Sequence, residues 1–200
     1  MKKVFKLFTL MGIIVVISFL YFYFNYQFWT YVKTDNFNSL VEYNGQNIKG
    51  LFGRQILVNK DFKNDLDQID KYAISHDIVL IINQSYRSEE ETINRKIVRP
   101  AKQSNHLAGF AIDFNIESNG VKYYANDLKR NNLKMLPNNI QEFINDIRHT
   151  RNLRWGGDFQ NEDPIHIDHP INILSRKKWL EYSKSCALDF SNANPAWGIF

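Results

Sequence analysis

The pattern of apolar and polar positions begins with a long uncharged run near the N-terminus. Residues 7–32 hold no charged side chain, and the 18 residues that end at Phe24 are almost wholly apolar. A membrane-spanning helix needs about 20 such residues, so the run predicts a single span. The aromatic stretch 21–29 resembles an interfacial belt and lacks a small-residue cleavage site. We therefore expect an uncleaved anchor at residues 1–33, rather than a signal peptide.

The pattern after the run predicts a polar linker and then one folded domain. Residues 34–56 are rich in asparagine and glycine, which favours a linker with turns. Residues 57–200 alternate between helical and strand periodicity, which indicates an α+β domain: a small antiparallel sheet with flanking helices. The periodicity predicts helices from about Asp61, over 88–98, from Pro137 and near the C-terminus, and strands at 78–82, 110–116 and 165–168. Residues 154–158 are predicted to form a strand-and-turn segment.

The excess of basic residues lies near the N-terminus. The chain has 25 basic and 21 acidic residues, and four lysines, at positions 2, 3, 6 and 33, precede the first acidic residue. The folded region therefore carries no basic excess, which argues against a nucleic-acid partner. The N-terminal lysines predict a cytoplasmic N-terminus and an extracytoplasmic domain at the cell membrane. Cys186 is the single cysteine, so an internal disulfide is excluded.

Two short segments hold the residue types of a metal site. His106 and Asp113 stand seven residues apart in the segment 104–113, and Asp163 precedes His166 by three residues. Two histidines and an aspartate make a three-ligand zinc site with a fourth position open for water, as catalytic zinc requires. The alternation at 110–116 places Asp113 on the face opposite the bulky apolar residues. We therefore expect His106, Asp113 and His166 to converge on one zinc ion.

Other polar residues near the second segment are alternative candidates for binding the metal or for orienting its ligands. On a strand, His166 and Asp168 face the same way, and His169 points to the opposite side. Asp168 is thus a candidate acceptor that orients an imidazole, whereas His169 is a less favourable alternative ligand. His76 and His149 fall near predicted helix C-termini, where a histidine suits the helix dipole, and we assign them no chemistry.

The segment Ser-x-His-x-x-Gly-x-Ala-x-Asp at 104–113 is followed about fifty residues later by the Asp163–His166 pair. This combination resembles the VanY-like zinc peptidases, which include D-Ala-D-Ala carboxypeptidases and the L-alanyl-D-glutamate endopeptidases of phage lysins. The resemblance runs over 57–169 and includes Tyr-Arg-Ser at 86–88 and Trp-Gly-Gly-Asp at 155–158. One departure is that an isoleucine stands between Pro164 and His166, where the endopeptidase branch usually has Pro-His-Phe.

The resemblance implies a role for each matching residue. His106, Asp113 and His166 match the zinc ligands, and Asp163 matches the catalytic acid/base. Arg87 matches the arginine that contacts the substrate near the scissile carbonyl, and Ser104 opens the motif as a candidate substrate-binding residue. These residue types suit the chemistry, because a carboxylate outside the ligand set can move the proton of a metal-bound water. A fixed guanidinium can stabilise the oxyanion that develops.

Together these observations predict a membrane-anchored zinc peptidase that acts on peptidoglycan stem peptides. Aspartate at 163 and the Trp-Gly-Gly segment favour L-alanyl-D-glutamate endopeptidase activity. Three alternatives stay open: a D-alanyl-D-alanine carboxypeptidase, a catalytically silent wall-binding module, and a membrane-tethered protein with structural zinc. A silent module would have lost a ligand or the base, and a structural site would be closed by further ligands such as a cysteine cluster.

Overall fold

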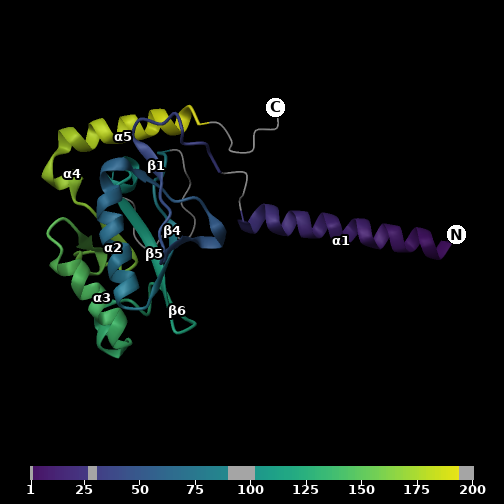
Figure 1. Ribbon diagram of the computed structural model, residues 1–200, viewed down its shortest axis with the longest axis horizontal. Coiled ribbons are helices and arrows are strands. Elements are labelled where there is room, and N and C mark those ends of the chain that lie inside the picture. The colour runs from purple at the N-terminus through teal and green to yellow at the C-terminus, as the bar shows by residue number, and fades with distance from the viewer. Residues whose placement is uncertain (1, 27–30, 90–101, 194–200) are drawn as a thin grey trace.

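The computed structural model of the chain is shown in Figure 1, and its description covers residues 2–26, 31–89 and 102–193. The side chains of residues 2–5, 7 and 22–26 are outside this description. The helix predicted over 88–98 falls mainly on residues 90–101, which also lie outside the described residues.

A six-stranded mixed sheet forms the centre of the domain. The order of neighbouring strands is β2 (Ile48–Gly50), β4 (Val79–Gln84), β5 (Ala111–Ser118), β8 (His166–Asp168) and β7 (Arg154–Trp155). The sixth strand, β6 (Val121–Tyr123), lies off this path and pairs with β5. The predicted α+β class is confirmed, but the sheet is mixed because β2 and β4 are parallel. Parallel neighbours need a long crossover connection, and the chain between these two strands includes a helix, α2 (Lys63–Ser75).

Helices cover one face of this sheet, as Figure 1 shows for α2 and α3 (Asn138–His149). On β5, Ile112, Phe114 and Ile116 are fully buried, and the ring of Phe114 meets that of Phe143 from α3 edge-on. Asp113 therefore lies on the opposite face of the sheet, as the alternation predicted. The remaining helical segments are α4 (Ile171–Leu174), α5 (Arg176–Ser191), and the short 3-10 turns η2 (Leu51–Gly53), η3 (Lys60–Phe62), η4 (Asn105–Ala108), η5 (Arg130–Met135) and η6 (Gly156–Asp158).

The stretch 34–56 differs from the predicted linker, because it supplies two strands of the fold. β1 (Leu40–Glu42) pairs with β3 (Leu57–Asn59), and β2 joins the main sheet. The carboxylate of Asp189 on α5 accepts hydrogen bonds from the backbone amides of residues 38, 39 and 40, at 3.0, 2.7 and 2.9 Å. Strands of three residues contain too little alternation to be recognised in a polar sequence.

The N-terminal run forms one helix, α1 (Lys2–Tyr26), which projects away from the domain (Figure 1). Among the described residues, we find no helix that combines the length and the apolar character of a membrane span. Leu7 and residues 22–24, at the two ends of the predicted span, have side chains outside that description.

Candidate metal centre

His106 is placed by the short turn η4 and by a carbonyl group behind it. The turn ends at Gly109, whose φ of 74° is left-handed, and a Cβ there would lie 2.6 Å from the backbone nitrogen of Asn59. Glycine is therefore required at this position. The His106 side chain is buried, and its Nδ1 lies 2.7 Å from the carbonyl oxygen of Ser85. Because a carbonyl only accepts, Nδ1 carries the hydrogen and Nε2 presents a lone pair.

Asp113 and His166 are brought together by strand pairing. In the antiparallel register of β5 and β8, these two residues stand directly opposite each other. Side chains that are opposite on one face of such a pair have Cβ atoms about 4.5–5.5 Å apart. The sheet thus supplies two members of the candidate site, and η4 supplies the third.

His166 presents its other ring nitrogen to the site. Its Nε2 lies 3.4 Å from Oδ2 of Asp168, two residues further along the same strand. A carboxylate in contact with one ring nitrogen fixes the tautomer, so Nε2 carries the hydrogen and Nδ1 is free to bind a metal. The alternation predicted that Asp168 and His166 share a face, and the structure places Asp168 against this imidazole.

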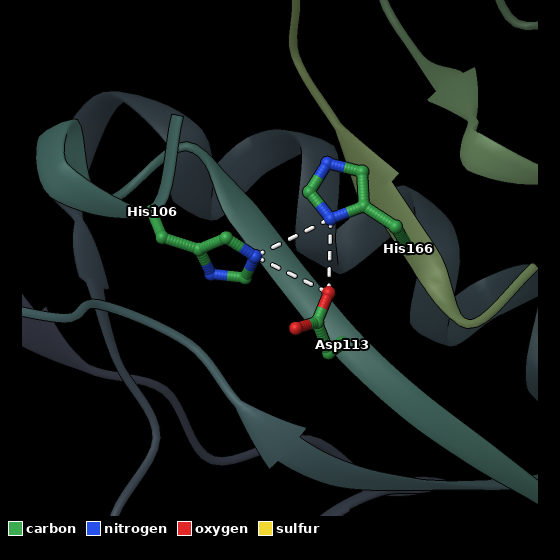
Figure 2. Close-up of side chains that lie close together, drawn as sticks. All are labelled: His106, Asp113 and His166. Atoms are coloured by element: carbon green, nitrogen blue, oxygen red, sulfur yellow. Dashed lines mark hydrogen bonds and ion pairs between the residues drawn. The ribbon is translucent and has the colours of Figure 1, made fainter. Parts of the chain in front are cut away.

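Three acceptor atoms converge at the centre of the site, as Figure 2 shows. His106 Nε2 lies 3.2 Å from Asp113 Oδ1 and 3.3 Å from His166 Nδ1, and the last two atoms are 2.9 Å apart. A tetrahedral zinc ion with bonds of about 2.0–2.1 Å needs ligand atoms about 3.3 Å apart. Both imidazoles direct a lone pair at a carboxylate oxygen, so the donor set and its spacing fit a bound cation.

The pKa values of His166 and Asp113 also show that this site favours positive charge. Burial opposes the charged form of His166, but its hydrogen bonds to Asp113 and Asp168 outweigh this and raise its pKa to about 10. Burial raises the pKa of Asp113, but the adjacent His106 and His166 outweigh it and hold the pKa well below its usual value. Because a histidine must be deprotonated at the nitrogen that binds a metal, metal binding through His166 would release a proton.

Asp163 lies beside the centre but outside the group of three. Burial and the charge of Asp113 raise the pKa of its carboxyl group above the ordinary value. Its backbone is fixed by Gly156, whose carbonyl accepts from Asp163 N at 2.9 Å, and by Trp155, whose Nε1 donates to the carbonyl of Pro164 at 2.8 Å. Trp155 and Gly156 therefore hold the loop that carries Asp163.

The other predicted site residues border the same region. Arg87 is buried, and its backbone amide donates to the carbonyl of His106 at 3.2 Å. Ser104 precedes η4, and its carbonyl accepts from Nε1 of Trp179 on α5 at 3.2 Å. Among the described residues, the cluster that could hold a metal consists of His106, Asp113 and His166, and it includes neither Arg87 nor Ser104.

The remaining histidines have partners elsewhere. His169 Nδ1 lies 2.8 Å from a carboxylate oxygen of Asp65. His76 contacts Asp146, and His149 contacts the carbonyl of Asn145. His169 therefore does not enter the site, as its orientation on the strand predicted.

Sequence reasoning missed three residues that support the centre: Ser85, Asn105 and Arg154. Ser85 acts through its backbone carbonyl, so its side chain gives no signal of this role. Asn105 donates to Asp168 Oδ2 at 2.7 Å, and Arg154 binds both oxygens of the same carboxylate. Asn105 and Arg154 lie 63 and 14 positions from Asp168 in the sequence, and local patterns do not report contacts at such separations.

Comparison with known families gives a match over part of the chain: residues 98–169 match the sequence model of a family described as D-alanyl-D-alanine carboxypeptidase. This stretch contains the three residues of the cluster and Asp163, whereas Arg87 precedes it. No curated protein matches the chain.

Proposed function

We propose that the chain carries a zinc peptidase domain of the D-alanyl-D-alanine carboxypeptidase family and hydrolyses the stem peptides of peptidoglycan. The observation that carries the proposal is the convergence of His106 Nε2, Asp113 Oδ1 and His166 Nδ1, with atoms 2.9–3.3 Å apart. Three acceptors at this spacing call for a cation, and three protein ligands leave a coordination position for water.

The proposed chemistry divides between the metal and the protein. Zinc at this site would lower the pKa of its bound water to about 7 and polarise the scissile carbonyl. Asp163 accepts the proton of the attacking water and delivers it to the leaving amine, a role that suits a half-buried carboxylate outside the ligand set. Its raised pKa favours this exchange, because it moves the group towards the operating pH.

Two further residues complete the proposed active site. The backbone of Arg87 is tied to that of His106, so its position is coupled to that of a proposed ligand. We assign its guanidinium to the oxyanion that develops at the scissile carbonyl. Ser104, at the start of η4, is assigned to substrate binding.

We propose cleavage of the L-alanyl-D-glutamate bond. The support is the resemblance of Asp163 and of Trp155–Gly156–Gly157 to the endopeptidase branch. The second candidate is removal of the terminal D-alanine, which the description of the matching family favours. The two activities leave different products, since only the endopeptidase separates the glutamate from the alanine that remains on the sugar.

We further propose that residues 1–33 anchor the protein in the cell membrane, with the N-terminus in the cytoplasm and the peptidase domain outside. α1 has 25 residues, which corresponds to a length of about 37 Å at 1.5 Å per residue. That length exceeds the hydrocarbon core of about 30 Å. Several of its apolar side chains are at least half exposed, among them Leu10, Ile14 and Ile17.

The experiment is digestion of purified muropeptides with tripeptide and pentapeptide stems by the zinc-loaded full chain in detergent, read by mass spectrometry. Endopeptidase activity releases a peptide that begins with glutamate from both substrates. Carboxypeptidase activity releases only D-alanine, and only from the pentapeptide. Unchanged substrates would instead support the silent wall-binding module.

A further inference from the structure

Asp168 is the acceptor for three side chains on the side of His166 that faces away from the three converging atoms. Arg154 donates from Nε to Oδ1 at 2.9 Å and from Nη2 to Oδ2 at 2.6 Å. Asn105 Nδ2 donates to Oδ2 at 2.7 Å, and His166 Nε2 lies 3.4 Å from the same oxygen. The carboxylate is only 3% exposed, so these groups replace the water that it has lost.

Asn105 links this carboxylate to the other histidine, because it is the residue immediately before His106. Its carbonyl accepts from Phe110 N at 2.9 Å, which fixes the backbone of η4. Its amide group also exchanges hydrogen bonds with Asn172 on α4, at 3.1 and 3.2 Å. Asn105 is 2% exposed. The contact between Asn105 and Asp168 therefore joins η4, which carries His106, to β8, which carries His166.

The sheet alone does not set the distance between these two elements. β8 pairs with β5 and β7, which places His166 opposite Asp113 but leaves η4 outside the ladder. A three-ligand metal site tolerates only small errors, since bond lengths must stay within about 0.2 Å of their normal values. A direct link between η4 and β8 meets this requirement.

We propose that Asp168, held by Arg154, positions both metal-binding histidines: His166 through its Nε2 and His106 through Asn105. These are positioning residues, because they act through the histidines and do not touch the ion. The inference rests on the proposed metal centre but not on any particular substrate. It predicts that loss of the network weakens metal binding even though all three ligands remain.

The test is zinc affinity of the full chain in detergent, measured by competition with a chromophoric chelator. Removal of such supporting partners typically costs 10–100-fold in metal affinity. We expect Asp168→Asn and Asn105→Ala each to weaken zinc binding by about this factor. The double variant should be little weaker than Asp168→Asn alone, because Asn105→Ala breaks a link that Asp168→Asn has already broken.

Asp189→Asn is the matched control. Asp189 is also a buried carboxylate with three donors, but these are backbone amides of residues 38–40. Its loss should lower the melting temperature of the zinc-free protein and leave zinc affinity unchanged. Arg154→Lys is a milder variant for the case in which Asp168→Asn does not fold, because lysine cannot form the two-pronged contact. It should weaken zinc binding less than Asp168→Asn does.

Two outcomes would overturn the inference: zinc affinities of the folded variants within twofold of wild type, or a double variant whose loss is the full sum of the single losses. Failure of the wild-type chain to bind zinc would instead refute the metal centre itself. The readout requires no substrate, so the two failures are distinguishable.

Discussion

The two histidines at the centre use different ring nitrogens, and each choice is set by one neighbouring oxygen. The carbonyl of Ser85 holds Nδ1 of His106, so this residue presents Nε2. The carboxylate of Asp168 faces Nε2 of His166, so this residue presents Nδ1. Because both outer positions are occupied by acceptors, each ring can bind a metal without changing its orientation.

The first prediction concerns the three ligands. His106→Ala, Asp113→Ala and His166→Ala should each sharply lower zinc content, since a three-ligand site has no spare ligand. Elemental analysis of the purified variants measures this, and His149→Ala is a control because His149 is exposed and its Nδ1 contacts the carbonyl of Asn145 on its own helix. Full zinc occupancy in any of the three variants would remove that residue from the site.

The second prediction separates binding from chemistry at Asp163. Asparagine is nearly isosteric with aspartate but cannot accept the proton of water, so Asp163→Asn should retain zinc and the fold. General acid–base catalysis contributes about 10²–10⁴-fold, so turnover should fall at least 100-fold.

Asp158→Asn is the control for this variant, because Asp158 is an exposed aspartate of the neighbouring turn η6 that pairs with Arg148. It should keep nearly full turnover. Loss of zinc from Asp163→Asn would make the carboxylate a ligand. Near-wild-type turnover would place the base elsewhere.

Single residues could be anticipated from the sequence where their chemistry is carried by side chains in short motifs. His106, Asp113 and His166 are of this kind. The sequence also predicted that His169 points away from the site, and it contacts Asp65. The support from Ser85 could not be predicted, because a backbone carbonyl is present at every position.

Among the elements, the turn η6 shows how a glycine shapes the site without taking part in chemistry. A Cβ on Gly156 would lie 2.4 Å from the carbonyl oxygen of Asp163 and 2.9 Å from Cβ of His166. Real Cβ atoms do not approach backbone so closely, so the loop would have to move. The Trp-Gly-Gly segment is thus explained by the packing of the loop that carries Asp163.

The third prediction follows from this packing. Gly156→Ala should destabilise the domain by about 1–3 kcal/mol, as overpacking of a dense interior does, and should lower turnover more than substrate affinity. Thermal unfolding and steady-state kinetics measure the two effects. Gly120→Asn is the control, since Gly120 has open space around it and a positive φ that asparagine tolerates. A Gly156→Ala variant with wild-type stability and rate would refute this role of the turn.

Prediction of the elements succeeded where periodicity was sustained and failed for the short strands within the polar stretch 34–56. The alternation on β5 and the buried stripe of α3, with Ile140, Phe143 and Ile144, were both predicted and are confirmed. β1 and β2 were missed, because each has three residues within a polar stretch. The single C-terminal helix is divided at Ser175, whose side chain accepts from Lys178 N and begins α5.

At the scale of the whole molecule, the chain joins the N-terminal helix α1 to the folded domain. α1 projects from the domain (Figure 1), and after residue 31 the chain forms β1, which pairs with β3, and β2, which joins the main sheet. Pairing of these strands within the domain leaves little free chain after residue 31. We therefore expect the domain to sit close to the membrane surface if α1 spans it.

The fourth prediction tests the anchor. In cells that express the full chain, the protein should remain in the membrane pellet after alkaline carbonate extraction, and added protease should digest the domain from outside. Replacement of Ile14 and Ile17 by lysine should release the protein from the pellet, because charged residues at the centre of a span are costly. Recovery of the wild-type chain in the soluble fraction would contradict the anchor.

The central claim, zinc-dependent hydrolysis of stem peptides, is tested most directly by the rate of muropeptide cleavage as a function of zinc bound per chain. The full chain is stripped with chelator and reloaded in steps, and Asp163→Asn is treated in parallel. The account predicts a rate that rises in proportion to zinc and reaches its plateau at one ion per chain, with Asp163→Asn equally loaded but at least about 100-fold slower. Cleavage by the zinc-free chain, or no cleavage of any stem peptide by the fully loaded and folded chain, would contradict it.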